Sequence, residues 1–195
     1  PPRSTLDRAS AASDVYKRQS FMPWLVGTAF LHSVMVQEKR KMFKVWNLFL
    51  IIVTFSLSLI GTFLVRSGVL TSVHTFATDP ERGLYILIFV TTIIGIAFGS
   101  LMIRAHKLKS QVEMDSMASR ESIFLFNNLF FLVATATVFL GTLYPLMVET
   151  WQGAKVTVGP PYYNTVFMPI ALGLLFLMGV GPYIPWRKAS QASLK

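Results

Sequence analysis

The chain has 195 residues, of which 53% are hydrophobic and 14% are charged. This composition, with a mean hydropathy of +0.53, is typical of integral membrane proteins and argues against a water-soluble domain. The net charge of +9 does not indicate a nucleic-acid partner, because the basic residues gather in certain loops instead of along one face. The sequence contains no cysteine, which excludes thiol chemistry by the chain's own residues.

The first 19 residues differ in character from the rest of the chain. They are polar and include several basic residues, and they lack the apolar segment that a signal peptide needs. We interpret residues 1–19 as a non-native leader joined to a transmembrane region, residues 20–195. A native disordered tail is the alternative interpretation.

Five uncharged apolar runs follow in chain order. A run of about 20 such residues crosses the hydrocarbon core of a membrane as a helix, although the first run is shorter than that. The sequence therefore predicts an all-α fold, a polytopic integral membrane bundle of about five transmembrane helices. These helices are expected near residues 21–36, 46–65, 84–103, 123–147 and 166–186. An odd number of crossings places the two ends of the chain on opposite sides of the membrane.

The segments between these runs differ in their basic residues. Segments 37–45 and 104–122 and the C-terminal tail carry most of the lysine and arginine of this region, whereas segments 66–83 and 148–165 carry few. Lysine and arginine are enriched in the cytoplasmic loops of membrane proteins. We therefore expect the basic loops to face the cytoplasm and the two other segments to face outward, toward the periplasm of a bacterial cell.

Two histidines are candidates for metal binding. His32 lies six residues before Glu38, about 9 Å inside the inner end of its helix at 1.5 Å per residue. His74 lies in an outward-facing segment, so the two imidazoles should be about 20 Å apart given the thickness of the hydrocarbon core. Two nitrogens on one metal ion lie about 4 Å apart. The two histidines therefore predict two separate sites.

Several polar residues have both a functional and an ordinary interpretation. A neutral imidazole is a good axial ligand for haem iron, and an ionisable residue inside a membrane helix indicates function. Taken alone, however, His74 is more typical of a solvated loop residue. Likewise, His32 is more typical of a partner for a nearby group such as the Thr28 hydroxyl. His106, in a basic loop, is expected to be solvated.

Two pairs of helical residues complete the set. Asn127 and Asn128 lie at a depth comparable to that of His32, where they are candidates either to orient its imidazole or to bond between helices. The pattern Gly95-x-x-x-Gly99 predicts a face on which another helix packs closely.

Four motifs in this order resemble one known family: SFMPWLVGTAFLHS, GTFLVRSGVLTSVHTFATDPERG, GTLYPL and VGPPYYN. The sequence from Ser20 to Trp186 closely resembles the CcmF family of cytochrome c-type biogenesis proteins, the membrane haem lyase component of cytochrome c maturation. The resemblance implies a middle piece of a longer protein. In that family a tryptophan-rich haem motif would end just before Ser20, where the leader stands in this chain.

The resemblance also implies roles for individual residues. His74 matches a histidine that ligates haem at the outer, tryptophan-rich site, and His32 matches one of two membrane histidines that hold a b-type haem. The second ligand of each iron would lie outside this chain. Arg66, at the outer end of its helix, is a candidate to bind haem propionates, or to reach the lipid headgroups. Trp24 is a candidate to wall the haem, or to belong to the aromatic belt.

The implied function is the covalent attachment of haem to apocytochrome c at the outer face of a bacterial inner membrane. The implied partners are a haem chaperone, apocytochrome c, other cytochrome c maturation subunits and membrane lipid. No residue is assigned a catalytic role, no motif of a hydrolase or nucleotide-driven pump is present in the sequence, and we expect no lyase activity from this chain alone. The alternatives are a transporter of haem or another small molecule, and a cytochrome b-type electron-transfer subunit.

Overall fold

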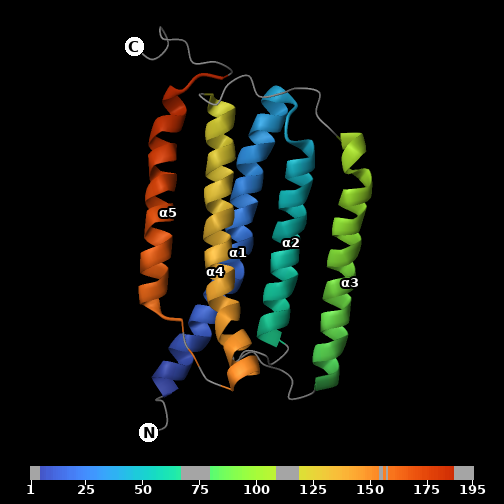
Figure 1. Cartoon of the computed structure of the whole chain (residues 1–195), viewed down its shortest axis with the longest axis vertical. Helices are drawn as coiled ribbons and strands as arrows, with labels where there is room; N and C mark the ends of the chain where they lie inside the picture. Colours follow the sequence, from blue (N-terminus) through green and yellow to red (C-terminus); the bar gives the residue numbers. More distant parts are fainter. Residues whose placement is uncertain (1–4, 67–79, 109–118, 154–155, 157, 187–195) are drawn as a thin grey trace.

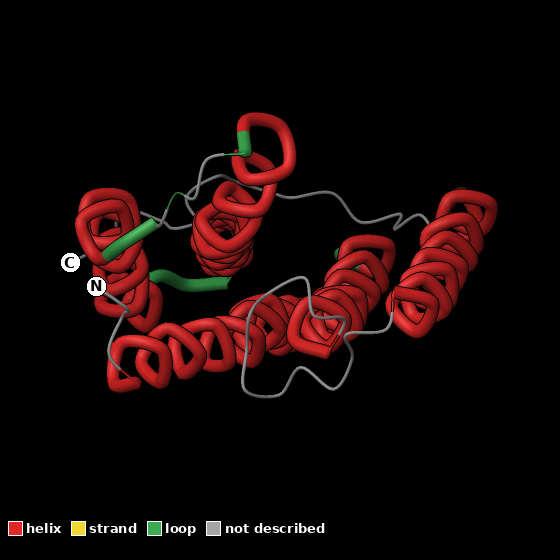
Figure 2. Tube along the Cα trace, turned by 90° about the horizontal axis from the view of Figure 1, so that it is seen from below, coloured by secondary structure: helices red, strands yellow, loops and turns green. Residues whose placement is uncertain are grey.

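The computed structural model describes residues 5–66, 80–108, 119–153, 156 and 158–186. Its five α-helices are α1 (Thr5–Arg40), α2 (Lys44–Arg66), α3 (Pro80–Arg104), α4 (Arg120–Gln152) and α5 (Pro160–Val180). A 3₁₀ turn extends α3 (η1, Ala105–Leu108), and another extends α5 (η2, Gly181–Tyr183). Every regular element in the described ranges is helical (Figure 2), which confirms the predicted all-α fold.

The helices stand side by side and alternate in direction (Figure 1). The end of α1, the start of α2, the end of α3, the start of α4 and the end of α5 lie together at one end of the bundle, the upper end in Figure 1. The lower end holds the opposite termini of the same helices. The first described helix thus starts at the lower end and α5 finishes at the upper end, and the placement of the chain ends on opposite sides of a membrane stays a prediction.

Four of the five helices are long and apolar enough to cross a membrane: α2, α3, α4 and α5. The chain is thus a membrane protein. The first helix does not meet this criterion over its described residues, because its apolar part, 21–36, is short and the rest of the helix, from Thr5 onward, is largely polar. The helix therefore also runs through most of the segment that the sequence analysis set apart as a leader.

The limits of α5 differ from those expected. Gly159 precedes the helix, and Pro160 and Pro161 form its first turn, where proline loses no hydrogen bond because the first amides of a helix have no partner within it. At the other end the α-helix stops at Val180, and Gly181 and Pro182 continue as a 3₁₀ turn. The helix is therefore shifted toward the N-terminus of the expected span, 166–186.

The first helix is the centre of the packing. Its buried residues Met22, Val26 and Ala29 meet Leu50 and Leu57 of α2 and Val138 of α4 in one apolar cluster. A smaller cluster joins Leu25 to Ala134 of α4 and Ile170 of α5. Among the described helices, α3 packs against α2, at the edge of the bundle (Figure 2).

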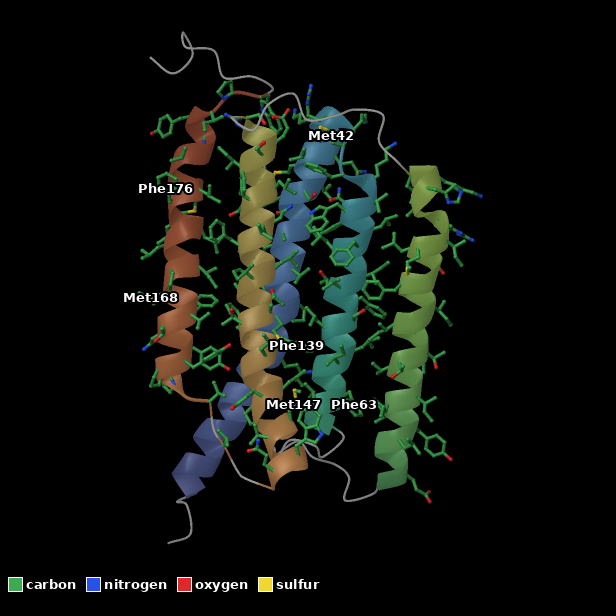
Figure 3. All side chains as sticks on the ribbon, in the orientation of Figure 1. Met42, Phe63, Phe139, Met147, Met168 and Phe176 are labelled. Atoms are coloured by element: carbon green, nitrogen blue, oxygen red, sulfur yellow. The ribbon has the colours of Figure 1, made fainter. Side chains whose placement is uncertain are left out.

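Outward-facing side chains of the edge helices are apolar. Figure 3 places Met168 and Phe176 on the outer side of α5, and 56% and 67% of their surfaces, respectively, are exposed. Gly95 and Gly99 of α3 have no described atom within 4 Å of the position that a Cβ would take. The prediction that they form a close-packing face is therefore wrong for the described part of the chain, because α3 turns a different side toward α2.

Polar contacts connect α1, α2 and α4 at the upper end of the bundle. The guanidinium Nε of Arg40 lies 2.8 Å from Oε1 of Glu121. The amide Nδ2 of Asn47 donates to Oε1 of Gln37 at 2.6 Å. The Arg40–Glu121 ion pair connects the last turn of α1 to the first turn of α4, and so it sets how the two antiparallel helices lie against each other.

Candidate functional site

His32 of α1 lies against α4. It is eight residues before Arg40, about 12 Å along its helix, and Asn127 is six residues after Glu121, about 9 Å along α4. Because the ion pair joins these two helix ends, the two side chains reach a similar level. The His32 ring nitrogen Nδ1 lies 2.6 Å from Nδ2 of Asn127. The sequence indicated Thr28, Asn127 and Asn128 as candidate partners of His32, and the structure supports Asn127.

The imidazole also lies beside two phenylalanine rings of α4. The ring centres of Phe124 and Phe131 are 5.7 and 5.8 Å from that of His32. Residues 124, 127 and 131 are three and four positions apart, so they share one face of the helix. This face therefore holds the imidazole through one hydrogen bond and two ring contacts.

The same histidine lines a cavity of about 470 Å³ between α1, α4 and α5. Most lining residues are apolar, and the exceptions in the described chain are His32, Asn127 and Arg120. The apolar walls come from α4 and from the last turns of α5 and the turn after it: Ile123, Phe124, Phe131, Leu174, Leu175, Leu177, Met178, Gly181 and Pro182. A half-buried imidazole beside such walls suits a flat, largely apolar ligand with one site for a nitrogen donor.

Arg120 closes the upper end of this cavity. Its Nε donates to the carbonyl of Ile184 at 2.9 Å and its Nη2 to that of Pro182 at 2.8 Å. Its guanidinium lies 5.4 Å from the ring centre of Trp186, a cation–π distance. These contacts hold the segment after α5 over the start of α4. Sequence reasoning counted Arg120 only as a loop charge, since nothing in its local pattern indicates this contact.

The neighbouring amide, Asn128, has a different role. With its amide oriented to satisfy its hydrogen bonds, Nδ2 donates to the carbonyls of Ala29 at 2.9 Å and Phe124 at 3.2 Å. The side chain is buried and joins α4 to the backbone of α1. Thr28, the other candidate partner of His32, instead donates to the carbonyl of Trp24 at 2.8 Å.

Trp24 is not among the residues that line this cavity, and the side chains of two other predicted site residues lie outside what the structure describes. Trp24, eight residues before His32, is 59% exposed. Its ring stacks on that of Phe21, with 5.8 Å between the ring centres. Arg66 is the last residue of α2, and its side chain lies outside what the structure describes. His74 also lies outside the described residues. His106 is exposed in η1, as expected for a solvated residue.

The fold and the site define a polytopic helical membrane protein with one histidine at an apolar cavity between three helices. Comparison with known proteins then specifies the family. A model of the cytochrome C assembly protein family matches residues 16–71. The CcmF protein of Pseudomonas aeruginosa, a cytochrome c-type biogenesis protein, is 51% identical over 174 residues, which cover 89% of this chain and 26% of that protein.

Two further matches agree. The CcmF protein of Escherichia coli is 48% identical over 176 residues, 89% of this chain and 27% of its own length. A solved structure of the cytochrome c heme lyase CcmF has a TM-score of 0.63 and 36% identity, and the match covers 88% of this chain and 24% of that one. The predicted resemblance to CcmF is thus confirmed, and the chain spans about a quarter of the length of these relatives.

Proposed function

We propose that this chain is part of a membrane haem lyase, which attaches haem covalently to apocytochrome c during cytochrome c maturation. The observation that carries the proposal is the position of His32, half-buried at the wall of an apolar cavity with Nδ1 already engaged by Asn127. The other ring nitrogen, Nε2, is the one that can bind iron when the ring proton is on Nδ1. The relatives that share this sequence are named for cytochrome c biogenesis and, in the solved structure, for haem lyase activity.

The cavity fits a b-type haem in its chemistry. The aromatic side chains of Phe124 and Phe131 flank the imidazole, the leucines of α5 supply apolar walls, and His32 supplies the nitrogen ligand. A haem bound there would supply one-electron redox chemistry. His32 would be one ligand of its iron, and a second ligand would come from outside this chain.

The attachment reaction itself belongs to the outer face. There we place His74 as the ligand of the substrate haem, with Arg66 beside its propionates and Trp24 at its edge. Each thioether forms when a cysteine S–H of the apocytochrome adds across a vinyl C=C bond, which creates one C–S and one C–H bond and needs no external oxidant. The thiols come from the apocytochrome, in keeping with a chain that has no cysteine.

We further propose that the protein lies in the bacterial inner membrane with its basic end in the cytoplasm. The ends of α1, α2 and α3 that lie together in Figure 1 hold Lys39, Lys44 and Arg104, and Lys41 and Lys107 lie just beyond α1 and α3. The positive-inside rule favours the cytoplasm for such a basic end. The segment with His74 would then face the periplasm, where a haem chaperone, apocytochrome c and other maturation subunits reach it.

The test compares two substitutions in the full-length protein. His32→Ala should remove the absorbance of the intramembrane haem from the purified protein. His74→Ala should leave that absorbance in place and abolish cytochrome c maturation, measured by haem staining of the product. Equal spectral effects of the two substitutions would refute the assignment of two sites.

A topology experiment tests the orientation separately. A cysteine placed beside His74 should react with a membrane-impermeant maleimide added from the periplasmic side. A cysteine in place of exposed Lys107 is the matched control at the opposite end and should be protected in intact cells. Labelling of the first site from the cytoplasm alone would invert the orientation and contradict attachment at the outer face.

A further inference from the structure

The contact between His32 and Asn127 raises a question of proton position. A neutral imidazole has one nitrogen that donates and one that accepts. When Nδ2 of Asn127 donates across the 2.6 Å contact to Nδ1, the ring proton is on Nε2. In that tautomer Nε2 has no lone pair to give to a metal, and the histidine cannot bind iron through Nε2.

A half-turn of the Asn127 amide reverses these roles. The amide oxygen and nitrogen have nearly the same size, so Oδ1 can take the place of Nδ2 without a change in the shape of the site. Oδ1 then accepts a hydrogen bond from Nδ1–H, and the lone pair of Nε2 becomes available. The two amide orientations thus correspond to a ring that is unable and a ring that is able to ligate.

We propose that Asn127 is a positioning residue that selects the iron-binding tautomer of His32. In the ligating state Asn127 Oδ1 accepts from Nδ1–H of His32, which fixes the proton on Nδ1 and makes Nε2 the ligand atom. The proposal rests on the proposed function, since it needs His32 as a ligand. Hydrogen bonds of this kind to the far nitrogen of a ligating histidine set its tautomer, its orientation and its strength as a donor.

The surroundings separate this role from simple helix packing. Phe124 and Phe131 hold the ring from either side, so the imidazole plane is limited before any ligand arrives. Asn128 already joins α4 to α1 through the Ala29 carbonyl. The chain therefore has two adjacent amides at this level, one on the backbone of α1 and one on the imidazole. Asn128 provides a matched control for Asn127.

The test removes the imidazole side chain of His32 and supplies free imidazole from solution. In the full-length protein, His32→Gly should lose the intramembrane haem, and added imidazole should restore its absorbance. Imidazole bound through one nitrogen still has an N–H for Asn127, whereas 1-methylimidazole has none. We expect imidazole to restore the haem at about fivefold lower concentration than 1-methylimidazole, the ratio that one ordinary hydrogen bond supplies.

Second-site variants show whether Asn127 causes that ratio. In His32→Gly with Asn127→Ala the acceptor is gone, so imidazole and 1-methylimidazole should restore the haem at about the same concentration. In His32→Gly with Asn128→Ala the fivefold difference between the two compounds should persist. An unchanged ratio in the Asn127→Ala background would overturn the inference and leave His32 as the ligand. Haem that stays bound in His32→Gly would instead overturn the ligand assignment itself.

A second measurement does not depend on rescue by a small molecule. Asn127→Asp keeps the shape of the side chain and offers only acceptor oxygens, so it should strengthen the donation of His32 to iron. The reduction potential of the intramembrane haem should shift to a more negative value. The same substitution at position 128 should shift it less. A potential that does not respond to Asn127→Asp would refute the positioning role.

Discussion

Two helices of this bundle, α4 and α3, are alike by the measures that identify membrane spans and differ in almost everything else. Their apolar spans, Arg120–Pro145 and Gly83–Leu108, each have 26 residues, with mean hydropathies of 2.1 and 2.5. Yet 33% of the most apolar stretch of the α4 span is buried inside the bundle, against 6% for that of α3. Hydropathy therefore tells which helices cross a membrane and not which ones pack.

The two helices also differ in which of their residues are buried. Asn128, Thr135, Thr137 and Thr142 of this helix are buried, whereas the buried residue of α3 in the described chain is Val90. In a membrane, apolar side chains gain little by leaving lipid for another helix, so close contacts and hydrogen bonds decide which helices associate. Of the buried polar residues of α4, Asn128 bonds to the Ala29 carbonyl of α1. The three threonines instead donate to carbonyls within α4 itself, so a polar contact between helices comes from the amide.

The sharpest test of this comparison removes one acidic residue from the first turn of each helix. Glu121 of α4 is 2% exposed and paired with Arg40, whose side chain is 12% exposed, whereas Glu81 of α3 is exposed. Glu121→Ala leaves a largely buried guanidinium without its carboxylate, and the free energy of unfolding should fall by about 3 kcal/mol. Glu81→Ala should change it by less than about 0.5 kcal/mol.

Denaturant titration of the purified protein in one detergent measures both values. The double variant Arg40→Met, Glu121→Leu controls for the loss of charge and should recover most of the stability, since an apolar pair of similar size can replace a buried ion pair. If Glu121→Ala and Glu81→Ala behaved alike, the ion pair would not connect α1 and α4 as described.

Glycines provide a smaller test with opposite expectations for the two helices. A Cβ added at Gly141 of α4 would come within 2.6 Å of the hydroxyl of Tyr163 and 3.0 Å of a ring carbon of Tyr162. Gly141→Ala should therefore destabilise the protein by about 1.5 kcal/mol, as overpacking does. Gly99→Ala in α3 meets no described atom within 4 Å and should be neutral or slightly stabilising, because alanine favours a helix.

The same unfolding titration measures these two variants. The result bears on the motif Gly95-x-x-x-Gly99, whose spacing suggested a packing face on α3. Loss of stability in Gly99→Ala of the full-length protein would mean that a helix beyond this chain packs there. The Gly141 result, by contrast, concerns contacts between α4 and α5 alone.

Much of the fold was predictable from the sequence because uncharged apolar runs determine membrane helices by length alone. The sequence also placed the two asparagines of α4 at a depth comparable to that of His32, and the structure brings Asn127 to its ring. The choice between Asn127 and Asn128 was not predictable, because adjacent residues point about 100° apart on a helix and the rotation of α4 decides which one meets the ring. The structure resolves it: Asn127 meets His32 and Asn128 meets the α1 backbone.

The cavity was not predictable for a related reason. Its walls combine α4 with the last turns of α5 and the turn around Pro182, and no local pattern says which faces of two distant helices meet. The sequence around Arg120 is that of an ordinary basic loop and does not indicate its hydrogen bonds to the carbonyls of Pro182 and Ile184. The roles of His74 and Arg66 stay predictions, since they depend on segments outside the described residues.

The smallest expected effect belongs to the buried amide of Asn128. Its Nδ2 donates to the carbonyls of Ala29 and Phe124, and Asn128→Leu removes this donor while keeping the volume similar. Hydrogen bonds between membrane helices are worth about 0.6 kcal/mol on average, and both carbonyls lie within helices, so the loss should be about 1 kcal/mol at most. Thr92→Val on the exposed side of α3 should change stability by less than the error of the titration. A loss of several kcal/mol for Asn128→Leu would instead mean that the contact between α1 and α4 depends on this amide.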